Sequence, residues 1–371
     1  MSGAGSPARV GIVGCGNISG IYFKAGQTFR MLDIVACADL DKARAEARAQ
    51  EYGVPKVLSV EEMLADPDID IVVNLTIPNA HYSVCKAALE AGKHVHVEKP
   101  LSITREQGNE LLAIANAKGL RLGCAPDTFL GGGLQTCRKL IDDGWIGEPI
   151  AATAFMQCHG HESWHPDPAF YYKAGGGPMF DMGPYYLTAL VFLVGPIKSI
   201  MGSTRVTFPE RTITSQPKYG TQITVDVPTH VSGIMNFANG AIGTITTSFD
   251  VWAHRHSCIE IYGTEGSLLV PDPNGFGGTV SVRRMGAPDW TDVPLSHGFA
   301  DNSRGVGVAD IAHAIRAGRP HRCSGELANH VLEAMHAFHD SSDAGALYTM
   351  QSACERPKPL PMGLPKDAVD D

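Results

Sequence analysis

A glycine-rich turn near the N-terminus has the residue types that bind a phosphate through the backbone. The apolar run Val10-Gly11-Ile12-Val13 is followed by Gly14-Cys15-Gly16-Asn17-Ile18-Ser19. Gly14 would permit a tight turn, and Gly16 would let the backbone approach a pyrophosphate at the N-terminus of the next helix. Ser19 stands where a third glycine or alanine is usual, and it is small enough for close helix–strand packing. The pattern predicts a dinucleotide site at Gly14, Gly16, Asn17 and Ile18.

An acid follows this turn at about the expected spacing of some twenty residues. Asp39 comes directly after the apolar run 33–38. There a carboxylate can accept hydrogen bonds from both ribose hydroxyls and would repel a 2′-phosphate. We therefore predict NAD as the cofactor, with NADP less favoured. The structural alternative is that Asp39, together with Asp41, caps the next helix.

The elements that must position these residues alternate between strands and helices. Apolar runs at 10–13, 33–38, 69–76, 94–97 and 119–124 are separated by helical patterns at 19–27, 41–52, 59–65, 81–91 and 104–118. Ser59 and Glu62 have the spacing of a capping box. This alternation predicts an α/β domain over 1–124, with a doubly wound parallel sheet covered on both faces.

The pattern changes after Cys124. A helix near 133–143 precedes long alternating strands. Asn239-Gly240 predicts a hairpin between 230–237 and 241–249, and residues 263–266 predict another between 258–262 and 267–270. Helices are expected at 306–317 and 326–339. We predict a substrate-binding and oligomerisation α+β domain over 125–355, with a large, open, mainly antiparallel sheet, and a loose arm over 356–371.

Composition excludes several classes of protein. The 371 residues are 44% hydrophobic and carry a net charge of −9, which suits two domains and gives no basic face for nucleic acid or an anionic membrane. Nine scattered cysteines without a C-x-x-C pair indicate reduced thiols. The small, polar N-terminus is unlike a signal peptide, and no apolar run is long enough to span a bilayer. We expect a cytoplasmic protein.

Three further segments accompany the glycine turn and Asp39. They are Thr76-Ile77-Pro78-Asn79-Ala80-His81, the segment 92–100 that ends in Glu98-Lys99-Pro100, and the segment 175–185. Together, over about residues 9–345, they resemble the glucose–fructose oxidoreductase / inositol dehydrogenase / rhizopine-catabolism (Gfo/Idh/MocA) family. The resemblance implies a Rossmann domain, a second domain on a large open sheet, and an active site between them.

The resemblance also implies roles for these segments. In similar proteins the Pro-Asn-x-x-His loop lines the cofactor, which here assigns Thr76, Pro78, Asn79 and His81 to it. The Glu-Lys-Pro segment would present Glu98 to the nicotinamide and Lys99 to both cofactor and substrate. In such proteins the Lys-Pro bond is often cis.

Proton transfer in the family falls on a lysine, an aspartate and usually a histidine, in the pattern Asp-x-Gly-x-His. Here the pattern is Asp181-Met182-Gly183-Pro184-Tyr185. A tyrosine has an ordinary pKa of about 10, which a neighbouring ammonium would lower. We hypothesise that Tyr185 accepts the hydroxyl proton, that Lys99 tunes it and bonds the reacting oxygen, and that Asp181 anchors Lys99 or a substrate hydroxyl. Alternatively, Lys99 is the base.

A purely structural interpretation of the same segment makes Asp181 a helix cap and Tyr185 a core aromatic residue. Pro184 adds a constraint, because proline is tolerated in the first turn of a helix but kinks its interior. Either a helix begins near Met182 or a helix bends there.

Polar residues elsewhere are candidates for the substrate pocket. The segment 159–165 holds three histidines and an acid. His159 and His161 would share one face of a strand, as metal ligands do. The glycine between them, and the redundancy of zinc beside NAD, lead us to predict no metal. Trp164 and His165 would instead stack on or bond a sugar-like ring, with a surface loop as the alternative.

Asp127 and Tyr172 complete the predicted pocket. Asp127 follows the last strand of the parallel sheet, where it would bond a substrate hydroxyl or the nicotinamide amide, or else cap a helix. Tyr172 precedes three glycines and would face the same space. So polar a pocket suits a polyhydroxylated ring.

We therefore predict hydride transfer between NAD and a sugar, polyol or inositol hydroxyl. A glycosidase or lyase that uses transient oxidation, and a non-catalytic dinucleotide sensor, are the alternatives. The second sheet has a face to cover, which predicts a homodimer or homotetramer.

Overall fold

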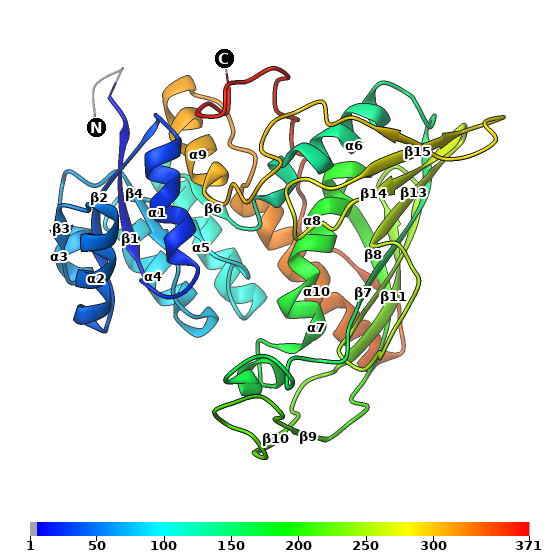
Figure 1. The fold of residues 1–371 in the computed structure, drawn as a ribbon, viewed down its shortest axis with the longest axis horizontal. Helices are drawn as coiled ribbons and strands as arrows, with labels where there is room; N and C mark the ends of the chain where they lie inside the picture. The colour runs from blue at the N-terminus through cyan, green and yellow to red at the C-terminus, as the bar shows by residue number, and fades with distance from the viewer. Residues whose placement is uncertain (1–5, 371) are drawn as a thin grey trace. The chain divides into compact units, whose positions relative to one another are not determined.

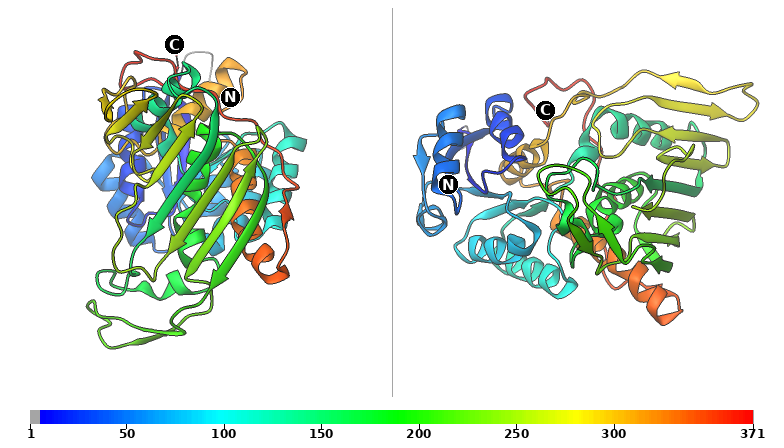
Figure 2. Two further views of the ribbon diagram at one scale, coloured as in Figure 1. Left: turned by 90° about the vertical axis from the view of Figure 1, so that its right-hand side faces the viewer. Right: turned by 60° about the horizontal axis from the view of Figure 1, so that its bottom comes forward.

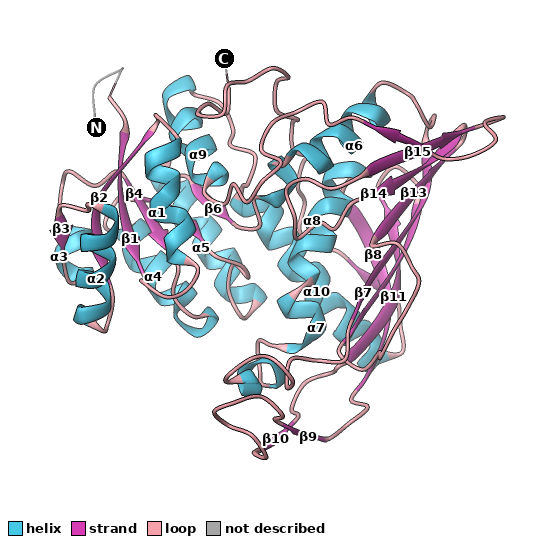
Figure 3. Cartoon of the chain, in the orientation of Figure 1, coloured by secondary structure: helices cyan, strands magenta, loops and turns pink. Residues whose placement is uncertain are grey.

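The computed structural model describes residues 6–370, which divide into two compact units. The first unit comprises residues 6–135 together with 295–332 and 357–370, and the second comprises 136–294 and 333–356. Residues 1–5 and 371, which include much of the segment compared with a signal peptide and the end of the predicted arm, lie outside the described residues. Each unit has its own sheet (Figures 1 and 3).

Six parallel strands form the sheet of the first unit, in the order β3-β2-β1-β4-β5-β6. They are β1 (Ala8–Val13), β2 (Leu32–Ala38), β3 (Lys56–Val57), β4 (Ile71–Asn74), β5 (His94–Val97) and β6 (Leu122–Cys124). The five predicted strands are confirmed, whereas β3 has only 2 residues and shows no pattern of its own. The order reverses between β1 and β4, and ligands gather at such a switch point, beyond the carboxyl ends of the strands.

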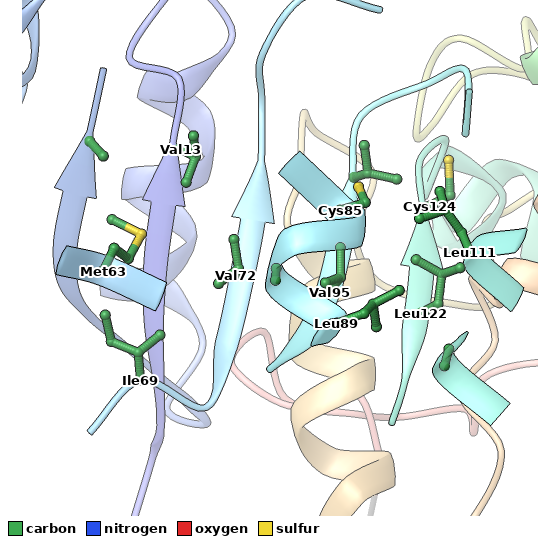
Figure 4. Packing of buried hydrophobic residues seen from close by; sticks show 14 of the residues in the cluster. Val13, Met63, Ile69, Val72, Cys85, Leu89, Val95, Leu111, Leu122 and Cys124 are labelled. Atoms are coloured by element: carbon green, nitrogen blue, oxygen red, sulfur yellow. The ribbon is translucent and has the colours of Figure 1, made fainter. Parts of the chain in front are cut away.

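The predicted helices of this unit are confirmed as α1 (Ser19–Thr28), α2 (Lys42–Tyr52), α3 (Val60–Ala65), α4 (Pro78–Glu90) and α5 (Arg105–Lys118). The Ser59–Glu62 capping box is present in full. Side chains of α3, α4 and α5, among them Met63, Leu89 and Leu111, pack against strand residues in one buried cluster (Figure 4). Apolar burial against the strands therefore fixes these helices on the sheet.

Helix α9 (Val306–Ala317) packs against β6 and α1 through two close approaches that glycine permits. A Cβ on Gly123 of β6 would lie 2.5 Å from Ile311 Cδ1, and a Cβ on Gly305 would lie 2.4 Å from Ala25 Cβ of α1. The compact units therefore follow a different division from the predicted 1–124 and 125–355.

The C-terminal segment also differs from its prediction as a loose arm, because its described part is bonded to the first unit. Leu360 N donates to Gln135 Oε1 at 2.8 Å. Asp370 accepts a hydrogen bond from Arg319 Nε at 2.6 Å, and Arg319 Nη2 donates to the fully buried Asp310 at 2.7 Å. Such charge-assisted bonds hold the segment in place.

Nine strands form the sheet of the second unit, in the order β16-β15-β14-β13-β7-β12-β11-β8-β17. They are β7 (Pro149–Gln157), β8 (Ile197–Arg205), β11 (His230–Phe237), β12 (Ile242–Ser248), β13 (Ile259–Gly263), β14 (Gly266–Val270), β15 (Val280–Arg284), β16 (Thr291–Val293) and β17 (Tyr348–Thr349). Only the β7–β12 pair is parallel among these pairings. Both hairpins are confirmed, and Gly240 has the positive φ of 92° that the first of them needs.

Helices α7 (Gly177–Asp181) and α8 (Gly183–Leu193) lie against one face of this sheet. Helices α6 (Gly132–Asp142) and α10 (Gly325–Ala344) each contribute residues to both units. The opposite face carries no helix of the described residues, and the left view of Figure 2 shows it. The sheet is therefore open on one side, and the predicted fold class is confirmed for both sheets.

Loops beyond one end of the second sheet form a separate feature, here called the loop lobe (residues 158–176, 206–229 and 249–257). It contains the short helix η2 (Pro168–Tyr172) and the two-stranded sheet of β9 (Glu210–Thr212) and β10 (Gln222–Thr224), visible at the bottom of Figure 1. The buried Arg211 donates to Glu162 Oε1 at 2.7 Å, to Phe249 O at 2.9 Å and to Asp250. Because breaking a buried ion pair is costly, Arg211 fixes the three loops to one another.

Candidate functional site

The glycine turn has the backbone that the sequence predicts. Gly14 has a φ of 98°, and a Cβ there would lie 2.7 Å from the backbone carbon and oxygen of Leu75. No atom lies within 4 Å of a Cβ placed on Gly16, so that side of the turn faces open space. The buried Ser19 donates from Oγ to Gly16 O at 2.7 Å. Helix α1 begins here without a side-chain cap, which leaves its first turn suited to an anion.

Asp39 ties the end of β2 to this turn. Its Oδ2 accepts a hydrogen bond from Cys15 N at 2.7 Å, and its Oδ1 accepts one from Asp41 N at 2.8 Å. Asp41 in turn caps α2 by accepting from Arg44 N. Asp39 therefore supports the start of α2, as the structural alternative proposed. A carboxylate has about four acceptor positions, so ribose hydroxyls can still bond to it.

A hollow of about 530 Å³ lies beside the turn. It is lined by Cys15, Gly16, Asn17, Arg44, Ala47, Arg48 and Glu51. Arg44 Nη1 lies 3.4 Å from Asp39 Oδ1, and Arg48 Nη2 donates to Gly16 O at 3.4 Å. The hollow has the size of a ligand pocket. Its glycine backbone fits a pyrophosphate, and Asp39, bonded to the lining residue Cys15, fits the adjoining ribose.

The loop after β4 is held from inside the unit. Asn74 Oδ1 accepts from Thr76 N at 3.2 Å and from Thr76 Oγ1 at 2.6 Å, and Pro78 opens α4 in its first turn. His81 is buried, with Nδ1 2.7 Å from Pro100 O and Nε2 3.0 Å from Thr76 O. Burial lowers the pKa of His81. His81 thus joins two turns, and cofactor contacts from Thr76, Pro78, Asn79 and His81 stay predictions.

Glu98 and Lys99 lie just beyond β5. Glu98 Oε1 accepts a hydrogen bond from Tyr22 of α1 at 2.8 Å, and Oε2 accepts one from Lys99 N at 3.0 Å. The Lys99–Pro100 bond is cis, as the resemblance implies. The Glu98 carboxylate is therefore fixed by α1 and by its own turn, while the side chain of Lys99 is half-buried.

Asp127 is buried at the start of α9. Its Oδ2 accepts from Gly305 N at 2.8 Å and from Gly307 N at 3.0 Å, and burial raises its pKa to about 6. Of the two predicted roles, the structure shows the helix cap, for a helix 178 residues further along the chain. The substrate contact of Asp127 stays a prediction.

Asp181 and Tyr185 lie on two short helices rather than on one. Helix α7 ends at Asp181 and α8 begins at Gly183, with Pro184 in its first turn. The predicted helix start near Met182 is confirmed, because α8 begins one residue after it. Tyr185 is 8% exposed, and the side chain of Asp181 is 18% exposed, with Oδ2 3.5 Å from His161 Nε2. Lys99 belongs to the first unit, so the joint action of the three residues stays a prediction.

The loop lobe contains the remaining predicted substrate residues. Trp164 is 61% exposed, and its ring lies edge-on to His161 and His165 at centroid distances of 5.3 and 5.4 Å. His165 Nδ1 accepts from Asp167 N at 3.0 Å. Tyr172 differs from its prediction. It has no exposed surface, packs in an apolar cluster with Phe249, and accepts a hydrogen bond from His161 N at 3.3 Å.

Sequence reasoning missed two features of the lobe. The approach of His161 to Asp181 joins segments 20 residues apart, and the bonds of Arg211 to Glu162 and Asp250 span longer separations. For a single histidine or arginine in a loop, the neighbouring sequence does not indicate which distant residue its side chain contacts. Among residues 6–370, no three His, Cys, Asp or Glu side chains are grouped closely enough to hold a metal ion, and no helix there is long and apolar enough to cross a bilayer.

Two models of one protein family match most of the chain. The model described as an oxidoreductase family with an NAD-binding Rossmann fold matches residues 8–125, and the GFO/IDH/MocA C-terminal domain matches residues 134–269. The chain therefore belongs to the GFO/IDH/MocA family. It is an enzyme, an oxidoreductase of the dehydrogenase and reductase type, and NAD is its cofactor.

Named relatives agree with this membership. The 1,5-anhydro-D-fructose reductase of Ensifer adhaerens is 29% identical over 267 residues, which cover 70% of this chain and 75% of the relative. The D-glucoside 3-dehydrogenase of Escherichia coli (strain K12) is 29% identical over 326 residues, or 82% and 91% of the two chains. The solved structure of levoglucosan dehydrogenase in complex with NADH shares the fold, with a TM-score of 0.80, 21% identity, and coverage of 94% and 100%.

Replacing Asp39 by alanine should weaken NADH binding by about tenfold or more, since roughly 1.4 kcal/mol corresponds to that factor. The variant removes an acceptor for ribose hydroxyls and releases Cys15 N. Fluorescence titration with NADH measures the Kd. Asp41→Ala is the matched control, because it removes a cap on α2 without touching the turn. An unchanged Kd in Asp39→Ala would refute the assignment.

The raised pKa of Asp127 predicts a pH-dependent contribution to stability. Because this carboxyl binds its proton more tightly when folded, its stabilisation is full below its unfolded pKa of about 3.9 and is lost as pH rises through about 6. The free energy of unfolding of the wild type, relative to Asp127→Asn, should fall by up to about 3 kcal/mol between pH 4 and 7. Urea unfolding at several pH values measures this difference, and a flat difference contradicts the prediction.

Proposed function

We propose that this enzyme transfers a hydride between NAD and a sugar, polyol or inositol-type hydroxyl or carbonyl group. The NAD part of this proposal rests on the Asp39 carboxylate, which accepts a hydrogen bond from Cys15 N beside an open hollow. An acid there favours a ribose with an unmodified 2′-hydroxyl. When bound, the nicotinamide supplies the hydride donor or acceptor, while the protein binds, orients and handles the proton.

Two observations support a polyhydroxylated substrate. The named relatives act on an anhydrofructose and on glucosides. The loop lobe exposes the Trp164 ring beside two imidazoles, an arrangement of apolar face and polar edge that suits a sugar ring. Polar groups that bond substrate hydroxyls also reject analogues that lack them.

For the proton, we propose that Tyr185 accepts it from the hydroxyl, that Lys99 tunes Tyr185 and bonds the reacting oxygen, and that Asp181 anchors Lys99 or a substrate hydroxyl. The alternative keeps Lys99 as the base. Both versions need the first unit to supply Lys99 and the second to supply Asp181 and Tyr185. The residues that line the rest of the pocket are proposed to include Trp164 and His165.

A screen of sugars and inositols with NAD⁺ and NADP⁺ should produce steady NADH accumulation with at least one substrate. With that substrate, Tyr185→Phe and Lys99→Met should each lower kcat by about 100-fold or more, the usual scale of proton-transfer catalysis. The pH dependence of kcat in the two variants identifies the base, because removing the base abolishes its titration.

Other outcomes of this experiment contradict the proposal. Wild-type rates in both variants would end the proton-transfer assignment. Bond cleavage without net NADH would indicate a glycosidase or lyase. Tight NADH binding without any turnover would indicate a dinucleotide sensor.

We also propose that the open face of the second sheet joins copies of the chain into a homodimer or homotetramer. Met201, Ile234 and Ile242 on this face are 42%, 45% and 52% exposed. Polar side chains between them are already paired, as Ser232 with Thr246 at 2.6 Å. A flat face of exposed apolar and internally satisfied polar groups suits a symmetric partner.

Light scattering on the purified chain should therefore give a dimer or tetramer. Ile234→Arg places a charge in the proposed interface and should shift the mass toward the monomer. Met285→Arg is the control, because Met285 is 81% exposed and lies in the turn after β15, several strands away from β12, β11 and β8 in the sheet order. A monomeric wild type would exclude the proposed assembly.

The cytoplasm is the location we propose, because the described residues hold no disulfide and a reducing compartment keeps thiols in that state. Recovery of the chain from a secreted or membrane fraction of its cells would contradict this location.

A further inference from the structure

His161 is held in a box of aromatic rings inside the loop lobe. Its ring centroid lies 4.0 Å from that of Tyr171, 4.6 Å from Phe249 and 5.3 Å from Trp164, in edge-on arrangements. Its backbone N–H donates to Tyr172 Oη at 3.3 Å. The residue is only 8% exposed. Packing on several sides therefore leaves the imidazole little freedom to turn.

The ring nitrogens of His161 are buried, and within residues 6–370 neither forms a hydrogen bond. Buried polar groups normally have a partner, so an unsatisfied imidazole calls for an explanation. Asp181 provides one, because its Oδ2 lies 3.5 Å from His161 Nε2. That separation exceeds an ordinary hydrogen bond by a few tenths of an ångström. A small movement of the carboxylate would close it.

The two sides of this pair are positioned independently. Asp181 ends α7, and its side chain is 18% exposed against 10% for His161. On the other side, Glu162 follows His161 and is bonded to Arg211 of β9 at 2.7 Å. The lobe thus fixes the imidazole, the end of α7 fixes the backbone of Asp181, and the carboxylate is the more accessible member.

We propose that His161 is a positioning residue for Asp181. Nε2 donates a hydrogen bond to Oδ2, fixing the rotation of the carboxylate and directing Oδ1 toward the ligand that Asp181 anchors. No covalent bond changes, and the proton stays on the imidazole. A fixed carboxylate contributes because misplaced groups lose much of their catalytic effect. The inference rests on the function proposed above for Asp181.

The kinetic test compares His161→Phe, His161→Gln and Asp181→Asn with the substrate that the screen identifies. His161→Phe keeps a ring in the aromatic box and removes both nitrogens, so kcat should fall about tenfold or more with the Kd for NADH unchanged. His161→Gln retains a donor and should recover most of that loss. In the Asp181→Asn background, His161→Phe should have no further effect, because the two residues act as a unit.

Phe249→Leu is the control for a purely structural role. It loosens the box around His161 without removing a nitrogen, so it should lower the Tm and reduce kcat much less than His161→Phe does. Wild-type kcat in His161→Phe, combined with a defect in Asp181→Asn, overturns this inference alone. Wild-type kcat in Asp181→Asn overturns the role of Asp181 and, with it, the inference.

A measurement that needs no substrate completes the test. In the full chain labelled with ¹⁵N-histidine, the His161 signals are those lost in His161→Gln. Asp181→Asn should shift the Nε2 resonance of His161 and leave that of His159 in place. An unchanged His161 resonance would overturn the proposed contact even if the variants alter kcat.

Discussion

The hydrogen bond from Cys15 N to Asp39 is the interaction on which the nucleotide-binding half depends. It joins the carboxyl end of β2 to the turn after β1, at the point where the order of the parallel strands reverses. The other oxygen of Asp39 accepts from Asp41 N at the start of α2. One carboxylate therefore aligns two strand ends and two helix starts. Because this bond fixes the glycine turn, it also fixes the position of the open side of Gly16 relative to the hollow beside it.

Other acidic side chains are also held by their neighbours. Some of them are buried and stabilise the fold, whereas others keep a partly exposed carboxylate. Asp127 is buried, and its Oδ2 is bonded to the N-terminus of α9. Glu98 is oriented by Tyr22 and by its own turn. Asp181 keeps an accessible side chain beside a buried imidazole. Neighbours held by packing or by the backbone thus fix the carboxylates of Asp127 and Glu98, and preorganised groups of this kind are what electrostatic catalysis requires.

Local patterns in the sequence predict what local physics determines. Alternating apolar runs and helices gave the parallel sheet, Asn239-Gly240 gave a hairpin, and Pro184 narrowed the helix beside Asp181 to two alternatives. The structure resolves that choice in favour of a helix start, because proline is accommodated in a first turn. Motifs with fixed spacing, such as the glycine turn with Asp39, predict the relative positions of their residues from the sequence alone.

Contacts between distant segments carry no such signal. The return of α9 to the first sheet, the capping of that helix by Asp127, and the bonds of Arg211 within the lobe each join residues far apart in the chain. Tyr172 illustrates the same limit, since nothing in its neighbourhood in the sequence shows that it packs inward against Phe249. The tail beyond residue 356 has the composition of a loose arm, yet Arg319 and Gln135 hold it. Whether such a side chain is buried, and therefore what it does, depends on contacts with residues that are distant in the sequence.

The most direct test of the central claim is calorimetric titration of the wild-type chain with NAD⁺ and with NADP⁺. An acid bonded to the glycine turn should make NAD⁺ bind at least about tenfold more tightly, a difference of roughly 1.4 kcal/mol. Equal affinities, or tighter binding of NADP⁺, would contradict the role given to Asp39 and the account built on it.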